Sequence, residues 1–167
     1  MPSPRPARGM PFMPSLLAPT VLASCLLATA VAAQEAGGLV TGSFGEQPLE
    51  LAVSADLSGA TLIGNHADAS LAAAQMQGDP GPVILTLTLG GALPDPGEVT
   101  LEIAFGRDMG RNWRGDQDSL TLELGEFAAA DGVVALSGTV TGEVSGGPAS
   151  ETRPVTFSFD ARIEQVD

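Results

Sequence analysis

Apolar and polar residues alternate with a period of two in six segments of this chain, and this alternation limits its fold more than any other feature. In the segment 155–163, for example, Val155, Phe157 and Phe159 alternate with Thr156 and Ser158. The other five segments are 49–54, 83–89, 99–105, 120–124 and 134–144. Successive side chains of a β-strand point to opposite faces, so each segment is predicted to form a strand with one apolar face. Antiparallel sheets with one packed and one solvated face have this pattern.

Three weaker segments, 39–44, 60–63 and 71–76, also read as strands. The last of them is rich in alanine and is equally compatible with a turn or two of helix. Turn-forming residues separate the segments, and Asp131-Gly132 between two apolar runs predicts a tight hairpin of type I′. Eight or nine short strands at even spacing predict an all-β fold: an antiparallel β-sandwich or, alternatively, a small up-and-down β-barrel. We expect residues 34–167 to form this single β-domain.

Residues 1–33 have the pattern of a secretory signal peptide. Arg5 and Arg8 give a positively charged start, and the apolar stretch that follows is densest over 20–33 and ends in small residues. A charged start, a short apolar middle and a small-residue end are the three parts of an export signal. We therefore expect cleavage before Ala33 or before Gln34, and a periplasmic or secreted mature protein.

Cys25 offers an alternative to ordinary cleavage. Residues 22–25 read Leu-Ala-Ser-Cys, which resembles the lipobox of bacterial lipoproteins. A lipid on Cys25 would anchor the protein to a membrane, and we expect membrane association only in that case. Apolar residues continue over 26–31, where lipoproteins usually have a polar tether, so the sequence favours ordinary cleavage. An uncleaved anchor over 9–34 is disfavoured by the prolines within it.

The charge of the chain restricts its partners. Residues 34–167 contain all 20 acidic residues of the chain but only five arginines, and the chain has no lysine. The formal charge of this part is therefore −15. Such a charge repels phosphate backbones, so we expect no nucleic-acid partner, whereas it favours solubility and cationic partners. The only cysteine is Cys25 and the only histidine is His66, so the predicted domain has no disulfide and no thiol nucleophile. We expect no cofactor.

The segment 106–118 is the strongest candidate for a functional site. It is the longest polar interruption between two strong strands, and we predict a hairpin loop there. Arginine and tryptophan are the residue types most often found at binding hot spots, and loops on rigid sheets often carry binding residues. The candidate partner-binding residues are Arg107, Asp108, Arg111, Asn112, Trp113 and Arg114. Alternatively, the loop folds on itself, with Arg111 or Arg114 stacked over Trp113.

The sequence contains two groups of possible metal ligands, and its pattern disfavours a metal site at either. Calcium would use oxygen ligands in the same segment, but their spacing departs from the EF-hand pattern and the interleaved arginines oppose a cation. These ligands are Asp108, Asn112, Asp116 and Asp118. His66 and Asp68 would supply two metal ligands, or a base and its orienting group, but no second histidine or cysteine completes a zinc site. We therefore predict no metal ligands.

Carboxylate chemistry is the remaining route to an enzyme. Glu102 and Glu123 lie in two strong strands that we expect to be adjacent, where the two side chains would face each other. A carboxylate pair of this kind performs glycoside hydrolysis. Plain solvation of the polar face explains both residues better, so we predict no catalytic residues.

The combined features predict an exported, non-enzymatic domain that binds a protein or another component of the cell envelope. Strand edges and the segment 106–118 would form the contacts. One alternative is a carrier with an apolar interior cavity, favoured by the small number of large side chains available to fill a barrel. The other is a carboxylate-based hydrolase. The sequence leaves the ligand and the oligomeric state open.

Overall fold

The structure is a computed structural model that describes residues 36–106 and 111–166. These residues form ten β-strands and one short 3-10 helix, η1 (Ala55–Leu57), and no α-helix lies among them. The strands are β1 (Gly37–Phe44), β2 (Gln47–Val53), β3 (Gly59–Ile63), β4 (His66–Gln75), β5 (Val83–Ala92), β6 (Glu98–Phe105), β7 (Arg111–Asp116), β8 (Leu120–Ala130), β9 (Val133–Gly146) and β10 (Glu151–Gln165).

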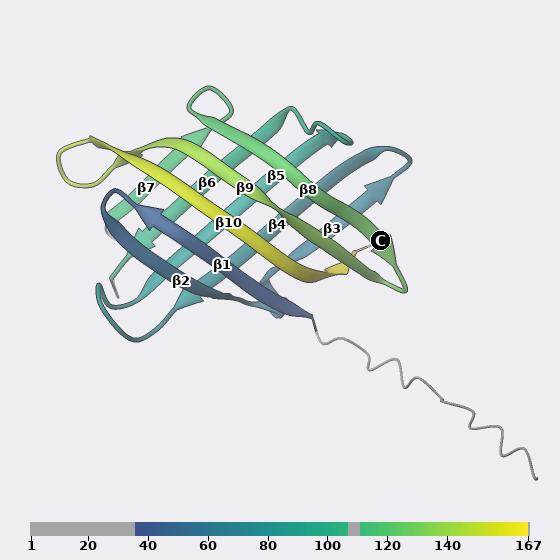
Figure 1. The fold of residues 1–167 in the computed structure, drawn as a ribbon, viewed down its shortest axis with the longest axis horizontal. Coiled ribbons are helices and arrows are strands. Elements are labelled where there is room, and N and C mark those ends of the chain that lie inside the picture. The colour runs from purple at the N-terminus through teal and green to yellow at the C-terminus, as the bar shows by residue number, and fades with distance from the viewer. Residues whose placement is uncertain (1–35, 107–110, 167) are drawn as a thin grey trace, which may run out of the picture. The chain divides into compact units, whose positions relative to one another are not determined.

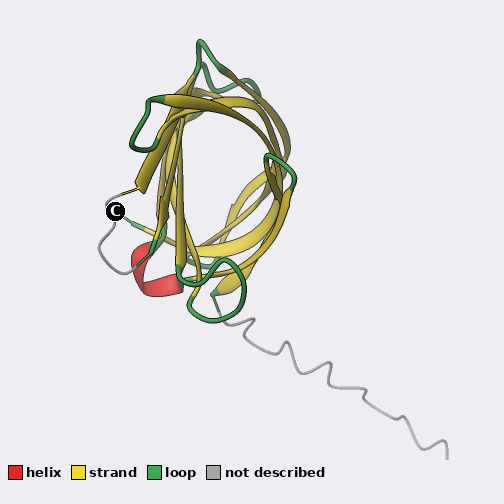
Figure 2. Ribbon diagram, turned by 90° about the vertical axis from the view of Figure 1, so that its left-hand side faces the viewer, coloured by secondary structure: helices red, strands yellow, loops and turns green. Residues whose placement is uncertain are grey.

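The strands form two layers that cross each other (Figure 1). One layer has the order β2-β1-β10-β9-β8, and the other has the order β3-β4-β5-β6-β7. At opposite corners β2 pairs with β4, and β7 pairs with β9, so the hydrogen-bonded pairing continues around a closed ring (Figure 2). All pairings are antiparallel except the short one between β10 and β3. The all-β prediction is confirmed, and the fold combines sandwich layers with barrel-like closure.

The structure has one strand more than the upper predicted number, and the reason is β7. The segment 106–118 is not a continuous loop, because residues 111–116 pair with β6 along their length. Its alternation is hidden in the sequence, since Trp113 is the only large apolar residue among polar ones. Cross-strand packing against β6 overrides this weak local preference. The ambiguous segment 71–76 lies almost entirely in β4 and is therefore extended.

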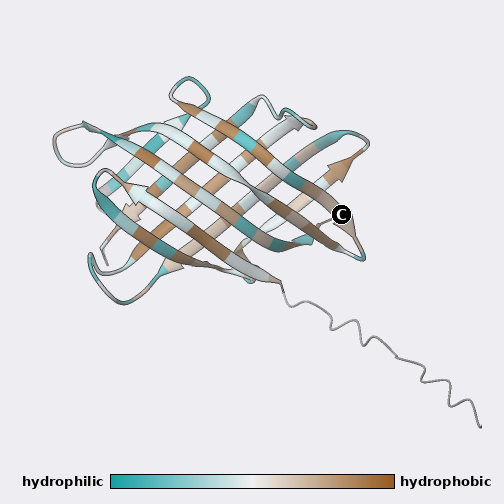
Figure 3. Ribbon diagram, in the orientation of Figure 1, coloured by the Kyte–Doolittle hydropathy of each residue, from teal (hydrophilic) through white to brown (hydrophobic). Residues whose placement is uncertain are grey.

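Apolar side chains from both layers meet in one core cluster. Hydrophobic and hydrophilic residues alternate along many of the strands (Figure 3). Phe157 and Phe159, which lie on the apolar face predicted for the segment 155–163, are 1% and 3% exposed and belong to this core. Glycines make room for both rings. Gly42 is the cross-strand partner of Phe157, and a Cβ at Gly42 would lie 2.7 Å from Cδ1 of the Phe157 ring. A Cβ at Gly138 would lie 2.7 Å from Cζ of the Phe159 ring.

The predicted hairpin at Asp131-Gly132 is confirmed. Asp131 has a φ of 53° and Gly132 a φ of 78°, and a type I′ turn requires positive φ at both central residues. This turn joins β8 to β9 with Ala130 opposite Val133. The hairpin thereby fixes the register that places Leu136 and Val140 in the core.

Candidate functional site

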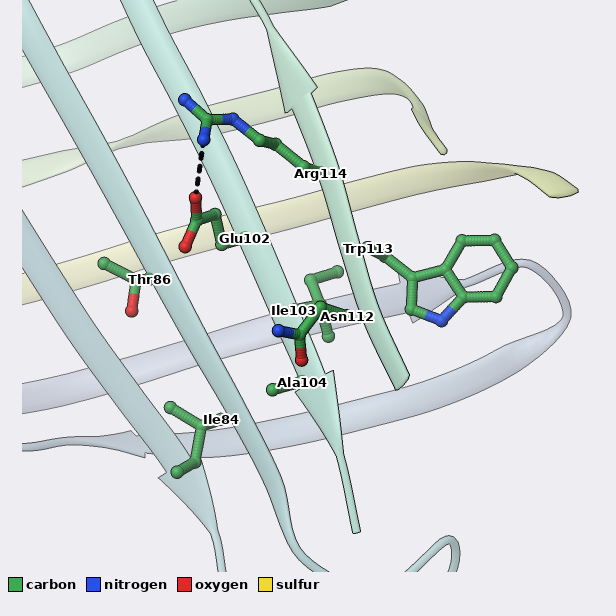
Figure 4. A pocket seen from close by; sticks show the side chains of 8 residues that line it. All are labelled: Ile84, Thr86, Glu102, Ile103, Ala104, Asn112, Trp113 and Arg114. Atoms are coloured by element: carbon green, nitrogen blue, oxygen red, sulfur yellow. Dashed lines mark ion pairs between the residues drawn. The ribbon is translucent and has the colours of Figure 1, made fainter. Parts of the chain in front are cut away.

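The outer face of β5, β6 and β7 contains a hollow of about 430 Å³ (Figure 4). Its lining side chains point away from the core because their chain neighbours, such as Leu85, Ile103 and Trp113, point into it. We call this feature the outer hollow. It is lined by the outward side chains of Ile84, Thr86, Glu102, Ala104, Asn112 and Arg114, with Ile103 and Trp113 contributing between them.

Strand register arranges these side chains in two rows across three strands. Ile84, Ala104 and Asn112 form one row, and Thr86, Glu102 and Arg114 form the other. Small side chains, above all that of Ala104, leave space at the centre, while longer ones stand around it (Figure 4). The hollow thus results from residue size on a regular sheet.

An ion pair forms one wall of the outer hollow. Nη1 of Arg114 lies 3.1 Å from Oε1 of Glu102, and the two side chains are 67% and 56% exposed. An exposed pair of this kind stabilises a fold by only about 0–1 kcal/mol. Its main consequence is therefore positional, since it places a guanidinium group and a carboxylate together beside the apolar Ile84 and Ala104.

The side chains of the outer hollow suit recognition by hydrogen bonding and apolar contact. Arg114 and the amide of Asn112 donate hydrogen bonds, whereas Glu102 and Thr86 accept them. Ligand sites combine a few placed polar groups with apolar surface, and volumes of about 300–1,000 Å³ are usual for them. The hollow is of a size to take a small molecule or one or two side chains of a larger partner.

Trp113 lies on the opposite side of β7 from the outer hollow and is only 7% exposed. Its ring is 4.9 Å from that of Phe44, at an angle of 73°, and Phe44 also stacks at 4.9 Å on Phe105. The guanidinium carbon of Arg153 lies 6.0 Å from the Trp113 ring. Among the described side chains, the cation over Trp113 is contributed by β10, whereas Arg114 pairs with Glu102 on the other face of β7. The expectation that Arg111 lies over Trp113 falls on a side chain outside the described part.

The sequence-predicted binding residues are divided by the structure. The side chains of Asn112 and Arg114 line the outer hollow, whereas the side chain of Trp113 packs in the core. The backbone of Arg111 begins β7, and its side chain lies outside the described part, as do Arg107 and Asp108.

Sequence reasoning missed the contributions of β5 and β6 to the site. Ile84, Thr86 and Ala104 are ordinary outward residues of predicted strands, so only the register of β5, β6 and β7 reveals that they lie beside Asn112 and Arg114.

The predicted adjacency of Glu102 and Glu123 is wrong. β6 pairs with β5 and β7, and β8 pairs with β9, so Glu102 lies opposite Arg114 while Glu123 lies opposite Thr139. The insertion of β7 between the two predicted strands separates the two carboxylates. Glu102 is instead engaged by a guanidinium group.

His66 and Asp68 lie on β4 and are close to each other. Nε2 of His66 is 3.5 Å from Oδ2 of Asp68, and both side chains are more than half exposed. The Asp116 carboxylate accepts a hydrogen bond of 3.1 Å from the backbone N–H of Asp118. Within residues 36–106 and 111–166, no group of three or more His, Cys, Asp or Glu residues is arranged to hold a metal ion.

Comparison of the chain with models of known families, with curated proteins and with solved structures finds no match. The one helix in the described part of the chain, η1, is neither long nor apolar enough to cross a membrane.

Proposed function

We propose that this chain is an exported, non-catalytic binding domain that contacts its partner, a protein or another component of the cell envelope, through the outer hollow. The observation that supports this most strongly is the placement of Asn112 and Arg114 in a hollow of about 430 Å³ on a regular sheet. The segment that the sequence singles out for its binding residue types thus contributes to a concave, accessible surface.

The rigidity of this surface supports a binding role. Asn112 and Arg114 lie on β7, which pairs with β6 along its length. The backbone of a paired strand is already ordered before a partner arrives, so binding loses less backbone entropy than it does with a flexible loop. Arg114 also has the residue type enriched at hot spots.

The two alternative functions need features other than the outer hollow. A carrier needs an apolar cavity inside the fold, and a carboxylate hydrolase needs two converging carboxylates. The outer hollow faces outward and holds one carboxylate, Glu102, whose neighbour is Arg114. A contact surface is therefore the better description of this site.

Replacing Arg114 with alanine should weaken partner binding by about 30-fold, which corresponds to about 2 kcal/mol for a hot-spot residue. The free energy of unfolding should change by less than about 0.5–1 kcal/mol, because the side chain is exposed. Immobilised mature protein and its variants would be titrated with fractionated envelope extract, and the retained component quantified and identified by mass spectrometry.

Arg162→Ala is the matched control for this experiment. Arg162 is an exposed arginine on β10, in the other layer, so its removal changes the net charge by the same amount. The control variant should retain the component as well as the unmodified protein does. Equal loss with both variants would show unspecific attraction to positive charge, and no loss with Arg114→Ala would refute the outer hollow as the contact.

Export gives a separate prediction. Protein recovered from producing cells should begin at Ala33 or Gln34, as the small residues that end the leader predict. Intact mass of the native protein measures this directly. A mass that instead corresponds to a chain beginning at a lipid-modified Cys25 would show an anchored lipoprotein.

A further inference from the structure

The strand β8 has one partnered edge and one open edge. It pairs with β9 from Leu120 to Ala130, and within the described residues no strand pairs with its other side. β8 therefore forms one margin of its layer (Figure 1). An edge strand presents unpaired N–H and C=O groups that another extended segment can bond.

The core is incompletely covered along this open edge. Leu120, at the start of β8, is 6% exposed because β7 lies against it, and a Cβ at Gly115 would be 3.0 Å from its Cγ. Farther along, beyond this contact, the inward side chains of Leu122, Leu124 and Phe127 are only half-buried. An added strand beside β8 would remove this apolar surface from water.

The neighbouring strand β9 shows what full coverage looks like. Its inward residues Val134, Leu136 and Val140 are at most 1% exposed, because strands lie on both sides of them. The contrast between β8 and β9 shows that the partly exposed apolar surface of the core lies at the open edge of β8, on its inward face.

The outward face of β8 is acidic. Glu123 and Glu126 are exposed, and neither takes part in the ion pairs formed among the described residues. They lie opposite Thr139 and Ser137 on β9, which carry no charge. Cationic side chains on an added strand would therefore lie next to two carboxylates that form no ion pair with a described side chain, and cross-strand pairs of opposite charge stabilise a sheet.

The same features oppose pairing with a second copy of the chain. An antiparallel pair of β8 strands centred between Glu123 and Glu126 would place these carboxylates next to those of the other copy, and like charges opposite each other destabilise a sheet. The register of β8 against β9 also shifts between Leu124 and Glu126, so the strand is irregular at this place. Charges and bulges are common protections against self-association of edge strands.

We infer that the open edge of β8 binds an extended segment of a partner protein in which apolar residues alternate with lysine or arginine. The segment adds a strand to the layer. Its apolar side chains cover Leu122, Leu124 and Phe127, while its basic side chains pair with Glu123 and Glu126. This inference rests on the proposed binding role but places a second contact on the other layer from the outer hollow.

A synthetic octapeptide that alternates valine and lysine, with blocked termini, is a suitable probe for the mature protein. It should bind at least about tenfold more tightly than a valine–glutamate octapeptide and than a valine–lysine octapeptide N-methylated at every residue, which has no backbone N–H to donate ladder hydrogen bonds from either edge. Fluorescence anisotropy measures the three affinities. Binding should slow amide hydrogen exchange over residues 120–130 at least about fivefold.

Variants separate this edge from other surfaces. Glu123→Gln with Glu126→Gln should weaken the valine–lysine peptide by about tenfold at low salt. Glu50→Gln with Glu164→Gln removes the same charge from exposed positions on β2 and β10 and should leave binding unchanged. Arg114→Ala should also leave the affinity for the valine–lysine peptide unchanged. The proposals for the outer hollow and for the β8 edge are therefore tested independently.

Three results would overturn the inference. Equal affinity for the N-methylated peptide would show attraction without strand pairing. Slow exchange at both edges of β8 before peptide is added would show that the chain already covers this edge. A dimer in sedimentation analysis that dissociates when the peptide binds would show that a second copy is the occupant.

Discussion

Replacing Phe157 with alanine is expected to lower the free energy of unfolding by about 3–5 kcal/mol, the range for buried aromatic residues. Phe157 is 1% exposed and belongs to β10, which pairs with both β1 and β9. The close approach of Gly42 means that backbone atoms line part of the space the ring would leave, and these cannot easily move inward. Urea unfolding of the variant and the unmodified protein measures the difference.

Ser158→Ala is the matched control, because Ser158 is the next residue and points outward. Replacing Ser158 with alanine should change the free energy of unfolding by less than about 0.5 kcal/mol. A cost under about 1 kcal/mol for Phe157→Ala would mean that the ring is not packed as described.

Trp113→Ala is expected to have a similar cost, about 3–5 kcal/mol, although Trp113 lies in a segment chosen for its binding residues. Its ring joins β7 to Phe44 on β1 and to Arg153 on β10, so its removal loosens contacts between the two layers. The aromatic pair and the cation–π contact each add about 0.5–1 kcal/mol to the loss of apolar burial. Urea unfolding followed by circular dichroism measures the cost.

Trp113→Phe keeps a ring at this position and should cost clearly less than the alanine variant. Fluorescence of the only tryptophan gives an independent check, since a buried indole emits at shorter wavelength and resists quenching by iodide. An emission maximum typical of exposed indole, together with an unchanged free energy of unfolding in Trp113→Ala, would contradict the packing of Trp113 in the core.

The fold follows from the sequence wherever alternation is strong. In β10 every second residue from Val155 to Ile163 is apolar, and all of them are buried. The Asp131-Gly132 turn is equally clear, because few residue pairs adopt positive φ without strain. β7 could not be predicted in the same way, since its polar composition resembles that of a loop and its pairing depends on β6.

The candidate site was only half predictable. Residue type alone singles out Asn112 and Arg114, whereas it places Trp113 on the same surface although strand alternation turns the Trp113 side chain into the core. The sequence predicts Glu123 as the neighbour of Glu102, whereas the neighbour is Arg114. This difference arises because the position of β7 between β6 and β9 is a property of the whole sheet. Register between distant strands brings Ile84 and Thr86 to the site, and local sequence does not encode it.

Photo-crosslinking at the outer hollow tests its proposed role most directly. A compact diazirine-bearing amino acid at position 84, where it replaces an aliphatic side chain, would be activated in cells that produce the protein, and adducts would be identified by mass. We expect a defined adduct at position 84, its loss when Arg114→Ala is added, and none at the control position 141, on the outer face of the other layer. No adduct at position 84, or equal adducts at both positions, would contradict the outer hollow as the contact surface.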